Sequence, residues 1–332
     1  MNSKKINADI YILGGGPAGM ASAYYAHNQG ASFHLFESTD QIGGNCKTLQ
    51  YKDFYFDTGA HRFHDKNKRV TEVVMNLLGD RLKKVESPSK IFWDNQFIEF
   101  PIRLRDVLAK LDSSVSRKII FENILNQFKG KDKIDNFKDL AYSNYGETLA
   151  ELFLINYTEK LWGCSPDELS LEVSGGRLKH LNIYSVLMKA LFRDNIKSKH
   201  LDGSFLYPEY GFGTIFEEIK NIIGRESISF NSPIINLFHE DNRIKNIMLN
   251  NSLSIKVNRG NSVVSTLSLP ILIKGMYPRP PSEIYDIVNS FQYRGLRLCI
   301  FFISKDYFSS NASIYFPQPE FPFTRIYEPK NR

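Results

Sequence analysis

The sequence predicts an α/β protein whose first element is a parallel strand–helix–strand unit. Three observations in the first 40 residues support this fold class. The apolar run Ala8–Leu13 is typical of a buried strand, and the sequence GGGPAG then turns the chain into a helix over Pro17–Gln29. A second apolar strand, Ser32–Glu37, follows at once. A strand, glycine loop, helix and strand in this order predict a Rossmann-type βαβ unit.

The length of the chain predicts more than one lobe. Single hydrophobic cores stop growing at roughly 250–300 residues, and the chain has 332. We expect residues 1–67 and 205–270 to form a discontinuous Rossmann-like FAD/NAD(P)-binding domain. Residues 68–204 are expected to form an inserted, mainly helical lobe that covers a substrate. Residues 271–332 are expected to contribute to a second, mainly antiparallel sheet.

The periodicity of apolar residues predicts the later elements. A helix is expected to begin at Lys68, and helices are expected to dominate as far as about residue 200. Val263–Thr266 is expected to return to the first sheet as a strand. The remaining expected elements are a hairpin of Lys90–Trp93 and Gln96–Phe100, helices over Glu147–Trp162 and Thr214–Ile223, and strands at Ser227–Phe230, Ile234–Phe238, Arg243–Leu249, Leu253–Val257, Leu296–Ser304 and Ser313–Phe316.

The composition excludes several classes of protein. The 42 Lys and Arg residues exceed the 36 Asp and Glu residues by six, but they form no long basic run, so a nucleic-acid partner is not predicted. The three cysteines, Cys46, Cys164 and Cys299, form no CxxC pair, which argues against a disulfide scaffold or a zinc site and favours the cytoplasm. No apolar run is long enough for a transmembrane span. Peripheral membrane contact and the oligomeric state remain open.

The glycine loop has the GxGxxG spacing that binds dinucleotides. Gly14 allows the tight turn after the strand, Gly16 lets the backbone approach a diphosphate, and Gly19 lets the helix pack closely on the strand. Pro17 and Ala18 begin the helix, whose free N–H groups and positive dipole end favour an anion. We therefore predict that all five residues bind a dinucleotide. The alternative is a plain glycine turn.

Glu37 ends the second strand at the position where such folds hold the adenosine ribose. Its carboxylate would accept hydrogen bonds from the ribose hydroxyls and repel a 2′-phosphate, and Ser38 is expected beside it. The alternative is a solvated residue at a strand end. NAD and FAD use this unit in the same way, so the ligand has to be identified from the residues that follow.

The continuation FESTDQIGGNCKT and FDTGAHRFH resembles a large group of flavoproteins. This group contains amine oxidases, protoporphyrinogen oxidases, phytoene desaturases and UDP-galactopyranose mutases. The resemblance implies that Gly43 and Gly44 are the glycine pair beside the flavin, and hence that the cofactor is FAD. Members often carry an arginine after the pair, whereas this chain has Asn45, as the mutases tend to.

Later segments extend the resemblance over nearly the whole chain. NYTEKLWGCSPDELS at Asn156–Ser170 and YPEYGFGTIFEEI at Tyr207–Ile219 are similar to segments of the mutases and of bacterial proteins like protoporphyrinogen oxidase. Ser232–Leu237 resembles the segment that meets adenine, with Ile234 at the usual valine position. The group usually ends in a glycine-containing segment that meets the flavin, and none is seen before Arg332. We therefore expect a chain shortened relative to this group.

Five further residues are candidates for the reaction or the substrate. His61 and His64, in a spacing similar to a mutase motif near the flavin, are candidate catalytic residues, and His61 also a cofactor ligand; the alternative is a pair of polar loop residues. Trp162 would stack on a uracil or belong to a core. Arg177 would hold a substrate diphosphate or form a surface ion pair. Tyr207 would line a substrate cleft or pack internally.

Three functions are consistent with these residues. Serine nucleophile, HExxH and Walker A motifs are absent, so the chemistry is expected from a cofactor. The first hypothesis is an FAD-dependent oxidoreductase that transfers hydride from a bulky organic substrate to flavin N5. The second is an isomerase like UDP-galactopyranose mutase, which uses reduced FAD on a nucleotide sugar without net redox change. The third is an inactive flavin-binding fragment.

Overall fold

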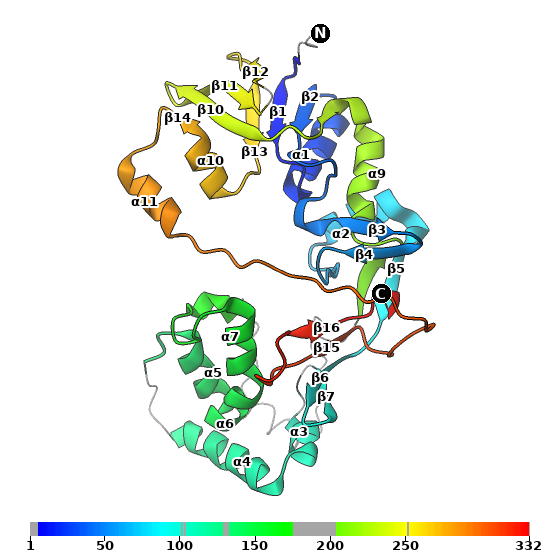
Figure 1. Cartoon of the computed structure of the whole chain (residues 1–332), viewed down its shortest axis with the longest axis vertical. Coiled ribbons are helices and arrows are strands. Elements are labelled where there is room, and N and C mark those ends of the chain that lie inside the picture. Colours follow the sequence, from blue (N-terminus) through cyan, green and yellow to red (C-terminus); the bar gives the residue numbers. More distant parts are fainter. Residues whose placement is uncertain are drawn as a thin grey trace. The chain divides into compact units, whose positions relative to one another are not determined.

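The computed structural model describes residues 6–100, 102, 104–128, 133–174, 204–250 and 252–331. The chain divides into two compact units (Figure 1). Unit 1 comprises Met1–Lys84 and Leu206–Ile300, and unit 2 comprises Val85–Phe205 and Phe301–Arg332. Each unit is therefore built from two separate stretches of sequence.

A four-stranded parallel sheet forms the centre of unit 1. The strand order is β13-β1-β2-β9, and Ile12 at the centre of the sheet pairs in register with Leu35 on one side and Val264 on the other. This sheet confirms the predicted α/β fold class and the return of the chain to β1. Its strands are β1 (Ile10–Leu13), β2 (Phe33–Phe36), β9 (Ile228–Ser229) and β13 (Ser262–Ser265).

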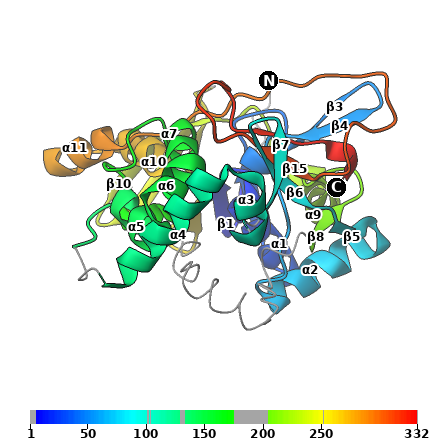
Figure 2. The ribbon, with the colours of Figure 1, turned by 90° about the horizontal axis from the view of Figure 1, so that it is seen from below.

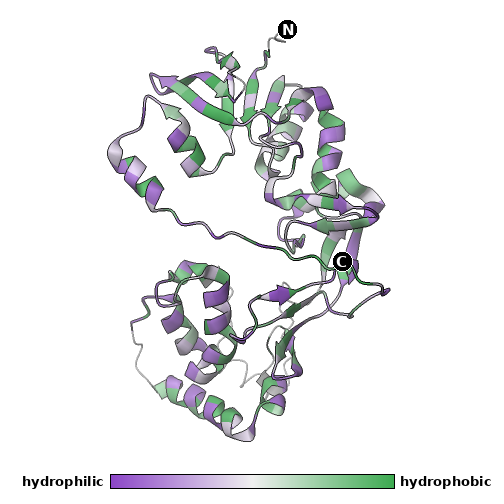
Figure 3. Ribbon diagram, in the orientation of Figure 1, coloured by the Kyte–Doolittle hydropathy of each residue, from purple (hydrophilic) through white to green (hydrophobic). Residues whose placement is uncertain are grey.

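Three helices of unit 1 share a core with one face of this sheet. In α9 the buried residues Ile215, Phe216, Ile219 and Ile223 recur at helical spacing, and they pack in one cluster with Ile12. The apolar stripe along α9 is visible in Figure 3. The helices are α1 (Pro17–Asn28), α2 (Lys68–Leu78) and α9 (Thr214–Ile223).

A second sheet covers the opposite face of β1 and β2. Because side chains alternate along a strand, Tyr11 and Leu13 point away from Ile12 and pack against Leu237 and Ile247. The strand order is β12-β11-β10-β14. The strands are β10 (Ile234–Glu240), β11 (Arg243–Leu249), β12 (Ser254–Lys256) and β14 (Met276–Tyr277).

Shorter elements complete unit 1, and two of them, β5 and β8, continue into unit 2. The hairpin of β3 and β4 follows the second glycine motif, and the boundary between the units falls within β5 and within β8. These elements are η1 (Gly44–Cys46), β3 (Thr48–Tyr51), β4 (Phe54–Asp57), η2 (Gly79–Arg81), β5 (Leu82–Glu86), β8 (Ser204–Pro208), η5 (Arg225–Ser227), α10 (Leu269–Gly275) and α11 (Ser282–Ser290).

Unit 2 combines a four-stranded sheet with short helices. The predicted hairpin is confirmed, and Asp94 and Asn95 at its turn have φ of 45° and 57°, the left-handed conformation that a two-residue hairpin requires. Its strands are β6 (Ser89–Trp93), β7 (Gln96–Phe100), β15 (Ser313–Tyr315) and β16 (Arg325–Ile326) in the order β16-β15-β6-β7. Its helices are α3 (Leu104–Lys110), α4 (Ser113–Phe128), α5 (Phe137–Tyr145), α6 (Glu147–Ala150), η3 (Glu151–Ile155), α7 (Asn156–Trp162), η4 (Leu171–Ser174) and η6 (Pro329–Asn331).

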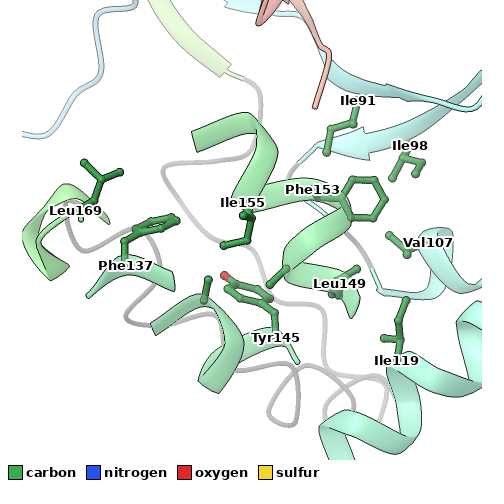
Figure 4. Packing of buried hydrophobic residues seen from close by; sticks show 12 residues of the cluster. Ile91, Ile98, Val107, Ile119, Phe137, Tyr145, Leu149, Phe153, Ile155 and Leu169 are labelled. Atoms are coloured by element: carbon green, nitrogen blue, oxygen red, sulfur yellow. The ribbon is translucent and has the colours of Figure 1, made fainter. Parts of the chain in front are cut away.

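The helices of unit 2 share one apolar core with the β6–β7 hairpin. Ile98 of β7, Ile119 of α4 and Leu149 of α6 are almost fully buried, and Phe153 fills the space beside them (Figure 4). Helices α4, α5 and α6 lie side by side (Figure 2). The sequence-based prediction of a mainly helical lobe thus holds for its described part.

The structure corrects two expectations about individual elements. Leu296–Ser304 is not a strand: although its sequence favours the β conformation, a strand needs a pairing edge, and this segment belongs to no sheet of the described residues. The second sheet is mainly antiparallel as predicted, because β7 pairs antiparallel with β6 and β16 with β15, while β15 runs parallel to β6. Glu147–Trp162 is interrupted by a π-helical turn at Glu151–Ile155.

The unit boundaries also differ from the predicted domain boundaries. Helix α2 was assigned to the inserted lobe, but it packs against α9 in unit 1, because Val74 and Leu78 join the core of the parallel sheet. Residues 271–300 likewise fall in unit 1. Within the described ranges, no helix combines the length and the apolar character needed to span a bilayer.

Candidate dinucleotide site

Two glycines of the loop are required by the fold itself. Gly14 has φ of +104°, and a Cβ built on it would lie 2.6 Å from Oγ1 of Thr266. A Cβ on Gly19 would lie 1.8 Å from the carbonyl oxygen of Gly14, because α1 passes directly over the end of β1. Thr266 follows β13, and its Oγ1 lies within hydrogen-bond distance of the carbonyl oxygens of Leu13 (2.9 Å) and Gly14 (3.2 Å). Nothing in the local sequence marks Thr266 as part of this site.

The two glycine motifs meet in the structure. The backbone N–H of Gly43 donates to the carbonyl of Gly15 at 2.8 Å. A Cβ on Gly44, which has φ of +55°, would lie 3.0 Å from Cα of Gly16. Residues almost 30 positions apart thus form one backbone surface at the end of β1.

Gly16 is not required by the packing of the protein. Its φ is −71°, which any residue adopts, and the nearest atom to a Cβ built on it is Cα of Gly44 at an ordinary 3.9 Å. The absence of a side chain therefore leaves a cradle that a Cβ would fill. This is the property expected where backbone approaches a diphosphate, so the residues present fit a dinucleotide.

The N-terminus of α1 presents donors beside this cradle. Gly16 caps the helix without a side-chain hydrogen bond from any described residue, and the first turn carries no acidic residue. Pro17 and Ala18 are exposed. The first N–H groups of a helix have no intrahelical acceptor, so they and the helix dipole favour an anion here.

Glu37 is buried and supports the loop. Its Oε2 accepts from the backbone N–H of Gly15 at 2.9 Å, and its Oε1 accepts from the backbone N–H of Thr39 at 2.8 Å and from Oγ of Ser38 at 3.1 Å. Only 6% of Glu37 is exposed. The residue therefore fixes the glycine loop through its carboxylate, in addition to the ribose contact predicted from sequence.

The segment containing Ile234 lies next to Glu37. The backbone N–H of Ser232 donates to the carbonyl of Glu37 at 2.8 Å, and that of Asn231 donates to the carbonyl of Thr39 at 2.9 Å. Ile234 itself is half-buried against the core between the two sheets of unit 1. The structure thus brings this segment to the end of β2 where the adenosine was predicted.

His61 lies beside the second glycine motif. Its Nε2 is 2.9 Å from the carbonyl oxygen of Asn45, which also accepts from Oγ1 of Thr58 at 2.8 Å. The His61 ring packs against Phe212, with 5.2 Å between ring centroids. His64 is half-buried after the bridge of Phe63 to β8. His61 thus contacts the segment of the glycine pair.

A buried carboxylate that no sequence motif indicates organises this side of the site. Asp57 is 2% exposed and accepts from Oγ1 of Thr48, from the hydroxyl of Tyr207 and from the backbone N–H of Phe212 at 3.0 Å. Tyr207, predicted to line a substrate cleft, is 7% exposed and directs its hydroxyl to this carboxylate. The structure therefore supports the alternative of internal packing for Tyr207.

Cys46, next to the glycine pair, is not poised as a nucleophile. Burial and the nearby negative charge of Asp57 both raise the pKa of its thiol, so the thiolate is disfavoured. Trp162, a predicted substrate residue, ends α7 in unit 2 and is 40% exposed. Arg177, another, is outside the described residues.

Comparison with known proteins agrees with this geometry. Residues 12–77 match the family model of the NAD(P)-binding Rossmann-like domain. The chain is 30% identical over 121 residues to ferredoxin–NADP reductase 2 of Listeria monocytogenes. This alignment covers 36% of this chain and 35% of the reductase. It is 28% identical over 227 residues to a probable UDP-galactopyranose mutase of Klebsiella pneumoniae. This alignment covers 65% of this chain and 53% of the mutase. The chain thus spans about a third to a half of the length of these relatives.

A solved structure extends the likeness to the fold. The crystal structure of reduced UDP-galactopyranose mutase superposes with a TM-score of 0.81 at 19% sequence identity, over 96% of this chain and 69% of that chain. Structures of a protoporphyrinogen oxidase and of an amine oxidase share the fold as well. With its parallel sheet, paired glycine motifs and buried Glu37, this part of the chain, residues 12–77 above all, has the build of an NAD(P)-binding Rossmann-like domain.

Proposed function

We propose that the chain binds FAD and belongs to an enzyme that acts on a nucleotide sugar in the manner of UDP-galactopyranose mutase. The observation that carries FAD binding is the meeting of Gly16 and Gly44, which leaves a cradle without side chains at the N-terminus of α1. When bound, a flavin supplies hydride or electron-transfer chemistry, or a nucleophilic nitrogen when reduced. The protein supplies the diphosphate site, the carboxylate of Glu37 and the imidazole of His61.

Three observations favour the mutase reaction over the oxidase hypothesis. The TM-score with the solved mutase is 0.81, compared with 0.61 for a protoporphyrinogen oxidase and 0.55 for cyclohexylamine oxidase. The sequence likeness to the Klebsiella mutase covers 65% of the chain. The residue after the glycine pair is Asn45, whose carbonyl holds His61. None of these features requires a net oxidation of the substrate.

The oxidoreductase remains the second candidate. It is supported by the sequence likeness to chloroplastic protoporphyrinogen oxidase 1 of Arabidopsis thaliana, which is 22% identical over 183 residues. In this case the same cofactor site would face a bulky organic substrate that loses a hydride. The two reactions differ in the oxidation state of flavin that they use, so they are separated by assay.

The first experiment tests FAD binding. Purified protein is titrated with FAD, and the perturbed flavin absorbance is followed, with Gly16→Val as the negative control. We expect the wild-type chain to bind and the variant to fail, because a side chain fills the cradle. Wild-type protein without any flavin spectrum would contradict both enzymatic functions.

The second experiment separates the reactions. The FAD complex is reduced with dithionite and incubated with UDP-galactopyranose, and the products are analysed for UDP-galactofuranose. We expect the furanose only with reduced protein. Absence of product, together with bleaching of the oxidised flavin by an amine or a porphyrinogen, would favour the oxidoreductase instead.

A further inference from the structure

Lys160 of α7 extends its ammonium group to the loop that joins β15 to β16 in unit 2. The backbone N–H of Phe316 donates to the carbonyl of Thr324 at 3.0 Å and so closes this loop, Phe316–Thr324. Four backbone carbonyl oxygens of the loop lie within hydrogen-bond distance of Nζ of Lys160. They belong to Phe316, Gln318 (2.8 Å), Phe321 (3.2 Å) and Phe323 (3.3 Å).

The sequence of the loop favours this convergence of carbonyl groups. Phe316, Gln318 and Phe321 each precede a proline. A proline has no N–H group and holds the residue before it in an extended conformation, and the loop forms no regular secondary structure. Its carbonyl groups therefore need a donor from elsewhere. The ammonium group of Lys160 supplies three N–H groups to them.

The four carbonyl oxygens form a site of the kind that binds a monovalent cation. Rings of backbone carbonyl oxygens take the place of water around K⁺ in ion channels, and an ammonium group is a similarly compact charge. The four oxygens carry no net charge, whereas sites for divalent cations usually include carboxylates. Burial of Lys160 lowers the pKa of its ammonium group, and the charge of Glu320 in the loop opposes this effect. The carbonyl dipoles thus replace part of the lost hydration.

We propose that the Phe316–Thr324 loop is a monovalent-cation site occupied by the ammonium group of Lys160, which is thereby a positioning residue for the end of α7. Gly163, with φ of 71°, ends the helix directly after Trp162. Lys160 therefore attaches the last turn of α7 to a loop that begins 156 positions later. The consequence for Trp162 as a uracil ligand rests on the proposed function, whereas the cation site does not.

The first test empties the site and offers it a free cation. Lys160→Ala is unfolded by heat in choline, potassium, ammonium or methylammonium chloride at equal ionic strength. We expect the variant to melt several degrees below wild type in choline chloride, because four carbonyl groups lose their donor. Ammonium or methylammonium should recover at least half of this loss, because these ions fit the site and choline does not. Wild type should melt alike in all four salts.

Two further variants make the test specific. Lys160→Met places an apolar side chain beside the carbonyl groups and should melt low in every salt. Lys330→Ala is the matched control, because Lys330 is an exposed lysine of the same unit that donates to the carbonyls of Lys305 (3.5 Å) and Asp306 (2.8 Å). It should melt alike in all four salts.

Three results would overturn the cation site. They are a Lys160→Ala protein that melts like wild type in choline chloride, one that melts equally low in every salt, and an equal recovery by Lys330→Ala. If Lys160→Ala does not fold in choline chloride, the yield of refolded protein is compared between choline and ammonium chloride. A higher yield in ammonium chloride would support the site, and equal yields would overturn it.

The second test measures whether the site positions Trp162. Binding of UDP is followed by calorimetry for wild type, Trp162→Ala and Lys160→Ala, in choline or methylammonium chloride. We expect Lys160→Ala to bind UDP severalfold more weakly than wild type in choline chloride and to regain affinity in methylammonium chloride, whereas Trp162→Ala stays weak in both. Unchanged UDP affinity in Lys160→Ala would overturn the positioning role. Wild type that does not bind UDP would refute the proposed nucleotide-sugar function, while the melting experiment still decides on the cation site.

Discussion

At the scale of single residues, the three glycines of the loop have different roles. Gly14 and Gly19 relieve contacts within the protein, namely those with Thr266 and with the carbonyl of Gly14. Gly16 relieves none, because a Cβ there would meet only Cα of Gly44 at 3.9 Å. A shared sequence motif thus divides into two residues that the fold requires and one, Gly16, that the packing of the described residues does not require.

This division predicts opposite phenotypes for two alanine variants. Gly16→Ala should keep the melting temperature of wild type and lose most of its affinity for FAD, because the methyl group occupies the cradle. Gly19→Ala should lower the melting temperature by several degrees, because its Cβ would overlap a backbone oxygen. Thermal unfolding without ligand and an FAD titration measure the two effects. A Gly16→Ala variant with a low melting temperature would contradict this assignment.

The sequence predicted the positions of these residues better than their contacts. The spacing of Gly14, Gly16 and Gly19 was sufficient to predict the βαβ unit, because that motif is local. Thr266 was missed because it reaches Gly14 from 252 positions away. The sequence left Tyr207 between a substrate cleft and internal packing, because its buried partner Asp57, 150 positions away, carries no local signal in the sequence.

At the scale of elements, a pair of charges fixes α9 to the turn after α2. Nη1 of Arg81 in η2 donates to Oε1 of Glu218 in α9 at 2.7 Å. The hydrogen bond from Arg81 is the main cause that lowers the pKa of Glu218 below its ordinary value of 4.5. A carboxyl group with a lowered pKa in the folded state stabilises that state above its unfolded pKa, and this contribution is lost as the pH falls through the folded value.

The pair predicts a pH-dependent difference in stability. Arg81→Met should have a lower urea midpoint than wild type at pH 7. The difference should shrink as the pH falls below the ordinary Glu value of 4.5 and through the lowered pKa of Glu218, because Glu218 then becomes protonated in both proteins. Lys83→Met, a nearby exposed charge loss, serves as control. A difference that stayed constant throughout the acid titration would mean that Arg81 acts through packing alone.

Elements were predicted most accurately where local sequence determines them. The β6–β7 hairpin is defined by Asp94 and Asn95 at its turn, and α9 by its apolar spacing and Gly224 at its end. The prediction of a strand at Leu296–Ser304 was wrong, because the β propensity of these residues does not specify a partner strand. The assignment of α2 was wrong for a related reason, since its apolar face does not specify which core it joins.

At the scale of the whole molecule, the apolar segment Leu296–Ser304 is exposed. Leu296 is 72% exposed and Phe301 82%, and both lie between α11 and β15, where the chain has no regular structure (Figures 1 and 3). Continuous exposed apolar stretches with β propensity favour association between molecules. We therefore expect this segment to dominate the solubility of the isolated chain.

The corresponding prediction concerns aggregation and not folding. Replacing both residues, as Leu296→Ser with Phe301→Ser, should change the melting temperature little, because the side chains are exposed, and should reduce light scattering on concentration. Serine at buried Ile98 in unit 2 is the contrasting control, which should lower stability by several kcal/mol. A large drop in melting temperature for the double variant would show that the segment is packed.

The position of β13 has a consequence for synthesis on the ribosome. The residues that build the glycine loop, β1 and α1, are made first, yet the strand beside β1 and the hydroxyl group of Thr266 that contacts Leu13 follow 253 residues later. Pairing over such a separation carries a large loop-closure entropy and is slow. The glycine loop is therefore completed late, after much of unit 2 has emerged from the ribosome, and until then β1 has β2 but not β13 beside it.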